Sequence, residues 1–88
     1  MLEGNLVVAD DCVAERLDNE LIVLNLSSGM YHQLNAVGIA IWQEIQEKSP
    51  SFATLIESLQ QKFDSPDITD DVRVFVKDLI ERGIILQK

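Results

Sequence analysis

The chain has 88 residues, of which 47% are hydrophobic and 25% charged, and 15 acidic against 7 basic side chains give a formal net charge of -8. This length and composition predict a single small globular domain, residues 1–88, and exclude a disordered tail. The negative charge disfavours nucleic acid and anionic membrane surfaces as partners, and no apolar run approaches the roughly 20 residues that cross a bilayer.

The first half of the chain has the residue patterns of strands. Residues 13–17, 20–26 and 30–34 predict a three-stranded antiparallel meander, and Leu6–Ala9 predicts an additional strand or arm. Asp18-Asn19 separates the first two strands of the meander with good turn residues. Small residues at positions 27–29, ending in Gly29, supply the second tight turn.

Side chains of the third strand alternate between two faces, as in any strand. One face carries Met30, His32 and Leu34, and the other carries Tyr31 and Gln33.

From Ala36 the spacing of apolar residues changes from two to nearly four, which predicts helices. The first helix begins after an Asn35 cap, buries Trp42, and ends near Lys48 before a Ser-Pro-Ser breaker. The second helix begins after Ser51, which caps it, and its apolar face extends from Phe52 to Phe63.

The segment Asp64–Asp67 predicts a second break, after which a third helix begins at Thr69. Two aspartates after Thr69 place negative charge at the positive end of this helix. Gly83 is expected in a left-handed cap at the end of the helix, and Ile84–Leu86 predicts a short strand-like tail. The whole pattern predicts an α+β fold of the winged helix-turn-helix kind, with an N-terminal three-stranded sheet followed by three helices.

Few residues suggest catalysis or a cofactor. Cys12 and His32 are the single cysteine and histidine, and there is no glycine-rich phosphate loop or nucleophile motif. The acidic pairs at 10–11 and 70–71 are better explained by a solvated turn and by helix N-terminal charge than by a metal site. We therefore expect no enzyme activity, no cofactor and no metal. One cysteine and no signal-peptide pattern make the cytoplasm the expected compartment.

Winged helices commonly bind DNA, so a transcriptional regulator is an alternative. Arg73, Lys77 and Arg82 place three basic residues on the third helix. Acidic residues at 70, 71, 78 and 81 share this helix, so it has no uniformly basic face. The sequence thus disfavours DNA binding.

Short motifs in a fixed order resemble the PqqD-like family of RiPP recognition elements, which hold ribosomally made precursor peptides for modifying enzymes. They are Leu24-Asn25-Leu26, Ser28-Gly29, Tyr31, Leu34-Asn35, Gly38, Trp42, Asp71-Val72, Phe75, Leu79 and Arg82-Gly83-Ile84. The similarity extends from about Val7 to Leu86, and the combination of Tyr31, Leu34-Asn35 and Trp42 in a stand-alone chain resembles the leader-binding protein of lasso-peptide clusters. Asn25 stands where the family often has aspartate, and His32 where an aromatic residue is frequent.

The resemblance implies that an extended leader peptide adds as a strand in the groove between the third strand and the third helix. A three-stranded sheet has open edges whose backbone groups can pair with such a peptide. The expected peptide-binding residues are Met30, Tyr31, His32, Gln33 and Leu34 on the strand, and Arg73, Val76, Lys77 and Ile80 on the helix. The opposite margin of the helix, with Phe75, Asp78 and Arg82, is the alternative.

The resemblance also implies partners. These are a precursor leader peptide and then a leader peptidase, a cyclase, or both. A PqqD-type adaptor for a radical enzyme that acts on a different peptide is a second possibility. An open edge strand can also pair with a copy of itself, so the chain is expected to be a monomer or a homodimer.

Overall fold

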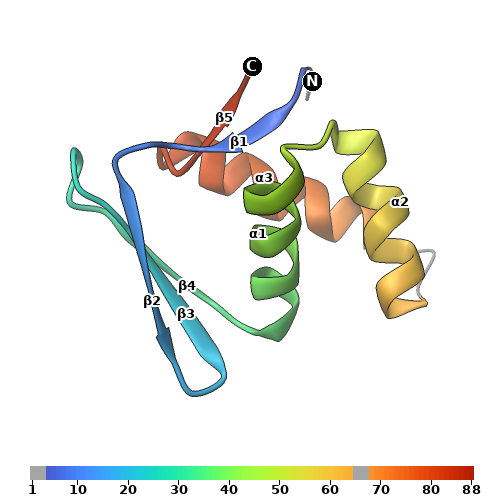
Figure 1. Ribbon diagram of the computed structural model, residues 1–88, viewed down its shortest axis with the longest axis horizontal. Coiled ribbons are helices and arrows are strands. Elements are labelled where there is room, and N and C mark those ends of the chain that lie inside the picture. Colours follow the sequence, from blue (N-terminus) through green and yellow to red (C-terminus); the bar gives the residue numbers. More distant parts are fainter. Residues whose placement is uncertain (1–3, 65–67) are drawn as a thin grey trace.

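A computed structural model describes residues 4–64 and 68–88 of the chain. Within these residues it has five strands and three helices (Figure 1). In chain order they are β1 (Leu6–Val8), β2 (Cys12–Leu17), β3 (Glu20–Asn25), β4 (Tyr31–Leu34), α1 (Ala36–Lys48), α2 (Phe52–Phe63), α3 (Thr69–Glu81) and β5 (Ile85–Gln87). None of the described helices is both long and apolar enough to span a membrane.

The predicted meander is confirmed as a three-stranded antiparallel sheet in the order β2-β3-β4. Its register pairs Leu24 with Tyr31 and Leu21 with Leu34. The turn between β2 and β3 has Asp18 at a positive φ of 52°, and the turn before β4 has Gly29 at 75°. Asparagine, aspartate and glycine are the residues that accept this left-handed conformation most readily, which explains where the chain reverses.

The first and last strands form a second sheet that the sequence did not predict. Strand β1 pairs with β5 in antiparallel register, with Leu6 opposite Gln87 and Val8 opposite Ile85. The backbone N–H of Leu6 also donates to the carbonyl of Pro50 at 2.8 Å, so the β1 segment is held on both sides. The two ends of the described chain therefore lie close together (Figure 1).

The first two helices begin at the predicted caps. Asn35 Oδ1 accepts the backbone N–H of Gly38 at 3.0 Å, and Ser51 Oγ accepts that of Thr54 at 3.2 Å. Helix α1 ends at Lys48, and Ser49 follows in the left-handed conformation with φ 46°. Both helix starts are thus determined by local side-chain chemistry.

Helix α3 begins at Thr69, as predicted. Its N-cap is Ile68, which provides no side-chain hydrogen bond. Asp70 and Asp71 occupy the first turn, where their charge favours the positive end of the helix, as expected. The rest of the predicted break, residues 65–67, lies outside the described residues.

The end of α3 is a Schellman motif. Gly83 has a φ of 74°, its N–H donates to the Ile80 carbonyl at 3.0 Å, and the N–H of Ile84 donates to the Leu79 carbonyl at 2.9 Å. This turn redirects the chain from the helix into β5. Gly83 is needed because its conformation disfavours a side chain.

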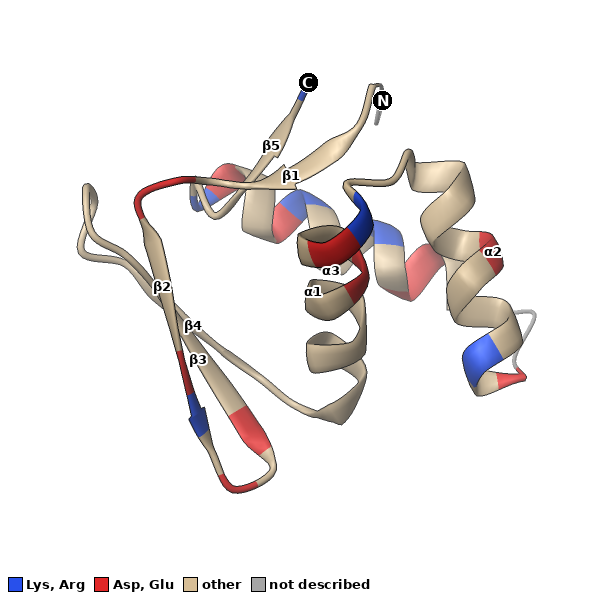
Figure 2. Cartoon of the chain, viewed as in Figure 1, with Lys and Arg blue, Asp and Glu red and all other residues tan. Residues whose placement is uncertain are grey.

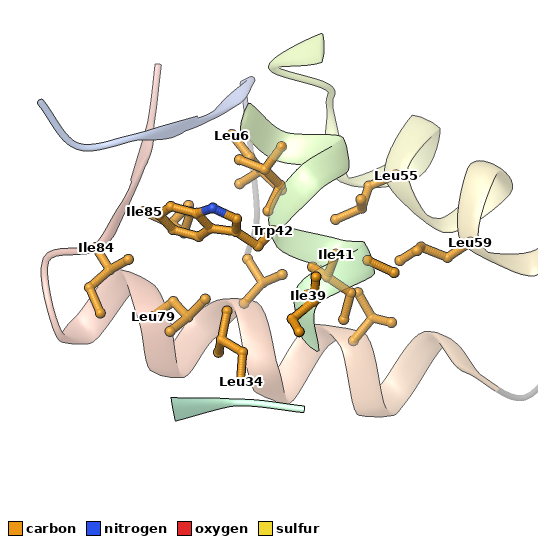
Figure 3. Close-up of a cluster of buried hydrophobic side chains, with 14 of the residues drawn as sticks. Leu6, Leu34, Ile39, Ile41, Trp42, Leu55, Leu59, Leu79, Ile84 and Ile85 are labelled. Atoms are coloured by element: carbon orange, nitrogen blue, oxygen red, sulfur yellow. The ribbon is translucent and has the colours of Figure 1, made fainter. Parts of the chain in front are cut away.

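The core lies where α1 meets α3, the inner face of the sheet and the β1-β5 pair. Figure 3 shows buried side chains from β1, β4, all three helices and residues 84–85 converging on one cluster. Trp42 is 3% exposed, which confirms its predicted place in the core. Val37, whose spacing with Ile41 and Ile45 predicts an apolar face of the first helix, is instead 44% exposed. Phe63 is 37% exposed, and both residues line an open hollow between the helices.

Candidate functional site

Strand β4 lies at an edge of the three-stranded sheet. It pairs with β3 on one side, and the sheet order leaves its other side without a partner strand among residues 4–64 and 68–88. The Leu6–Ala9 arm, which could have filled this side, contributes β1 to the separate sheet with β5. The edge of β4 is therefore open to an incoming chain.

One hydrogen bond defines which backbone groups face outward along this edge. The Asn25 N–H donates to the Met30 carbonyl at 2.9 Å, so Met30, His32 and Leu34 direct their N–H and C=O groups toward β3. Because inward and outward residues alternate along an antiparallel ladder, Tyr31 and Gln33 direct their N–H and C=O groups away from β3. These groups are the available donors and acceptors for an added strand.

The side chains of β4 alternate as predicted. Leu34 is buried on the inner face and His32 is half-buried there. Tyr31, at 64% exposed, and Gln33 lie on the outer face of the sheet. Met30, just before the strand, is also exposed. An added strand would thus meet a polar backbone edge between an apolar inner face and a more exposed outer face.

The margin of α3 beside β4 carries Phe75, Asp78 and Arg82. The His32 and Phe75 rings meet edge to face with centroids 6.0 Å apart, and His32 Nδ1 lies 3.7 Å from Asp78 Oδ2. Arg82 Nε donates to both carboxylate oxygens of Asp78 at 3.2 Å. This is the margin that the sequence left as the alternative.

The other predicted residues of α3 lie elsewhere. Arg73 pairs with Asp70 at 2.8 Å and lies over the Phe52 ring at 5.4 Å, so it faces α2 and not β4. Val76 is fully buried, and Ile80 packs against the core cluster. The structure therefore does not bring Arg73, Val76 or Ile80 to the β4 edge.

Lys77 is exposed and lines a shallow hollow on the outside of α3, together with Phe75 and Asp78. Peptide contacts of these residues stay predictions. The spacing of residues 75, 78 and 82 already placed them on one strip of the helix. Only the packing of the sheet shows that this strip lies beside β4.

Three hollows follow one another along β4 and α3. One of about 460 Å³ lies at the start of the strand, lined by residues 29–33 and Arg82. The next, of about 360 Å³, lies at the end of the strand and includes Glu20, Asn35 and Phe75. Asn35 and Phe75 also line a third, largely apolar hollow of about 470 Å³, which lies between the start of α1, the end of α2 and the start of α3. Neighbouring hollows share wall residues, and we call this row of hollows the β4-α3 groove.

The exposed Val37 and Phe63 line the apolar end of this groove. Gly38 lets α1 approach its wall closely, because a Cβ on Gly38 would lie 3.1 Å from the Phe75 ring and 3.2 Å from Leu34 Cβ. A side chain at this position would therefore require the Phe75 ring to shift slightly.

Asn25 is a positioning residue that the sequence analysis missed. The residue is 5% exposed, and its Nδ2 donates to the Gly83 carbonyl at 2.9 Å, while its Oδ1 accepts the N–H groups of Ser27 and Ser28. The amide thus ties the turn before β4 to the end of α3. An aspartate cannot make the first bond when ionised, because it has no donor. The one signal of this role in the sequence was that Asn25 stands where the family often has aspartate.

The described residues offer little for catalysis. No group of three or more His, Cys, Asp or Glu side chains within residues 4–64 and 68–88 could hold a metal ion. Burial, with a smaller contribution from Asp11, raises the pKa of the Cys12 thiol, so its reactive thiolate is disfavoured. The nearest hydrogen-bond partner of this thiol is the Ile84 carbonyl at 4.0 Å, whereas His32 contacts Phe75 and Asp78.

Comparison with known proteins defines the family. The model of the family described as coenzyme PQQ synthesis protein D (PqqD) matches residues 20–85. The match covers most of the chain, and the chain belongs to the PqqD family. A search of curated proteins found no match.

Two solved structures are similar to this chain. One, described as TbiB1 in complex with the TbiA(beta) leader peptide, is 25% identical, with a TM-score of 0.76 over 90% of this chain and 93% of that chain. The other, described as lasso peptide synthetase B1 complexed with the leader peptide, is 24% identical, with a TM-score of 0.78 over 94% of this chain and 99% of that chain. The second supports the fold alone.

Proposed function

We propose that this chain is a non-catalytic RiPP recognition element that binds the leader segment of a ribosomally made precursor peptide of the lasso type. The leader would add as a strand to the edge of β4, with its inward side chains in the β4-α3 groove. The observation that carries the proposal is the open edge itself, with outward groups at Tyr31 and Gln33 and a groove beside it. The similar TbiB1 structure, which holds a leader peptide, supports this ligand class.

Titration of the protein with a synthetic leader peptide, from the precursor encoded beside it, tests the proposal. We expect a dissociation constant on the order of 1 µM or below. Backbone amide shift changes should cluster on Tyr31–Leu34 and on the Phe75–Arg82 margin of α3. Changes that cluster on β5, or binding too weak to saturate, would contradict the proposal.

The same experiment tests the site residues. The sequence predicted Met30, Tyr31, His32, Gln33 and Leu34, and these line the edge and its hollows. On α3 we now favour Phe75, Asp78 and Arg82, because the packing of His32 against Phe75 and Asp78 places that margin beside β4. Shift changes at Arg73 in place of Arg82 would restore the first choice.

Delivery to a partner enzyme is a further part of the proposal, with a leader peptidase and a cyclase as the partners and the cytoplasm as the compartment.

The outer face of the sheet supports a second protein contact. The register aligns Val13, Leu24 and Tyr31 in one row across the three strands, and Val13 and Tyr31 are 49% and 64% exposed. Val13→Asp should weaken partner binding and leave leader binding intact. Whether the free chain is a monomer or homodimer is read from its sedimentation.

The family match favours one second candidate. The matching family is described by coenzyme PQQ synthesis, and an adaptor for a radical enzyme would have the same fold and the same open edge. Genes beside this one separate the two candidates: a peptidase with an asparagine-synthetase-like cyclase supports the lasso pathway, and a radical enzyme supports the adaptor. DNA binding has less support, since acidic and basic residues alternate along α3 (Figure 2).

A further inference from the structure

Arg82 lies at one end of the β4-α3 groove. It lines the hollow of about 460 Å³ whose other walls are residues 29–33. Its side chain is 34% exposed, so solvent or a ligand can reach it. Neither of the two other hollows of the groove has an Arg or Lys in its wall among the described residues. Those two hollows instead contain Glu20 and Asp71.

The guanidinium of Arg82 is used on one side only. Nε donates to both oxygens of Asp78 at 3.2 Å, and within residues 4–64 and 68–88 no acceptor is found for the two terminal nitrogens. A guanidinium carries five N–H donors in a planar fork, so it can hold one carboxylate at Nε and a second one at its terminal nitrogens. Asp78 Oδ2 also lies 3.7 Å from His32 Nδ1, so the pair lies beside the strand.

We propose that Arg82 binds an acidic side chain of the leader, at the end of the bound segment that lies beside Met30 and Tyr31. This inference rests on the proposed function and specifies the chemistry of its ligand. Ionised bidentate pairs are stronger and more directional than neutral hydrogen bonds. The acidic Glu20 and Asp71 disfavour the same carboxylate at the opposite end, so the charge pattern selects one register of the peptide.

The test is a scan of the leader in which each Asp or Glu is replaced in turn by its amide, with binding to the wild-type protein measured by fluorescence anisotropy. One replacement should weaken binding about tenfold, as expected for a partly exposed charged hydrogen bond. The variant Arg82→Gln should bind the unmodified leader about tenfold more weakly. In that variant the critical replacement should have no further effect, because the two partners act as a pair.

Two variants separate direct contact from a merely structural role. In Arg82→Gln the critical amide replacement should have no further effect if Arg82 contacts the leader, and should weaken binding as much as in the wild type if Arg82 only positions Asp78 and His32. Arg73→Gln is the matched control, since Arg73 also pairs with an aspartate on α3 but faces α2. It should leave the affinity unchanged.

The outcomes also distinguish this inference from the proposed function. Failure of the wild-type protein to bind the leader overturns the proposed function. Binding by the wild type with equal affinity for every amide-substituted leader, or with no loss in Arg82→Gln, overturns the role of Arg82 and leaves the proposed function standing. A leader that binds tightly and has no acidic residue in its bound segment would likewise overturn the role of Arg82 and leave the proposed function standing.

Discussion

The two sheets of this small protein differ in how an outer strand is covered. In the β1-β5 pair the protein itself covers the outer side of β1, where the Leu6 N–H donates to the Pro50 carbonyl, and both Leu6 and Ile85 are fully buried. The β4 edge has no partner strand in the described chain, and Tyr31 beside it is mostly exposed. An open strand edge is a hazard that proteins usually cover. Because the N-terminal arm covers β5 and leaves β4 open, we infer that the β1-β5 pair stabilises the fold and the β4 edge binds.

The largest effect on stability should come from weakening the β1-β5 sheet. Leu6→Ala removes a fully buried side chain and should lower the free energy of unfolding by about 3 kcal/mol, as large-to-small core substitutions do. Chemical denaturation measures this loss. Leader affinity of the remaining folded protein should be unchanged, and a parallel loss of affinity would mean that the β1-β5 pair also shapes the groove.

Blocking the open β4 edge should instead lower leader affinity and leave stability nearly unchanged. Gln33→Pro removes an outward N–H and blocks the edge with a ring, so leader affinity should fall about 30-fold, or about 2 kcal/mol. The unfolding free energy should change little, because edge strands tolerate proline where the N–H faces outward. Ala14→Pro, at an outward position of the opposite edge strand β2, is the control and should bind normally. Equal losses in both variants would refute the assignment of the binding edge.

The link between the two regions can be tested at Asn25. Asn25→Asp replaces the donor to the Gly83 carbonyl by a buried carboxylate, which should lower the unfolding free energy by about 1.5 kcal/mol at neutral pH. In acid the introduced carboxyl group becomes neutral, and its O–H can then donate to the same carbonyl. Thermal unfolding at pH 7 and pH 4 should therefore show a smaller deficit at the lower pH, and an equal deficit at both would contradict this role.

The smallest effect is expected at the far margin of α3. Arg73→Ala removes an exposed ion pair with Asp70 and the contact with the Phe52 ring. Such interactions contribute roughly 0.5 kcal/mol at exposed sites, so the unfolding midpoint should fall only slightly. Leader affinity should not change. A loss as large as that of Gln33→Pro would show that the leader contacts the α2 side of α3.

Much of the fold could be predicted because its signals are local. The caps Asn35 and Ser51 and the Gly83 turn act within a few residues of their own positions, and the structure shows all three where the sequence placed them. The start of α3 at Thr69 also agrees with the prediction, although Ile68 precedes it without a side-chain bond. The exposure of Val37 and Phe63 escaped prediction, since apolar spacing says nothing of whether another element covers a face.

The candidate site was predictable in part. Alternation along β4 placed Tyr31 and Gln33 together on one face, and the family resemblance pointed to the third helix. The choice between the Arg73 and Arg82 margins needed coordinates, because both lie at helical spacing beside the same apolar stripe. The bond from Asn25 to Gly83 joins positions 58 residues apart, and no local pattern reports such a bond.

By itself the sequence determined the strands, the helices and the family, since turn residues, caps and apolar periods operate over distances of a few residues. Tertiary structure decided that the β4 edge stays open and which side of α3 borders it. Both depend on where β1 finds its partner, and β1 and β5 are separated by nearly the whole length of the chain. Pairing over that separation is selected by the burial of Leu6, Ile84 and Ile85 in a common core, which only the folded chain creates.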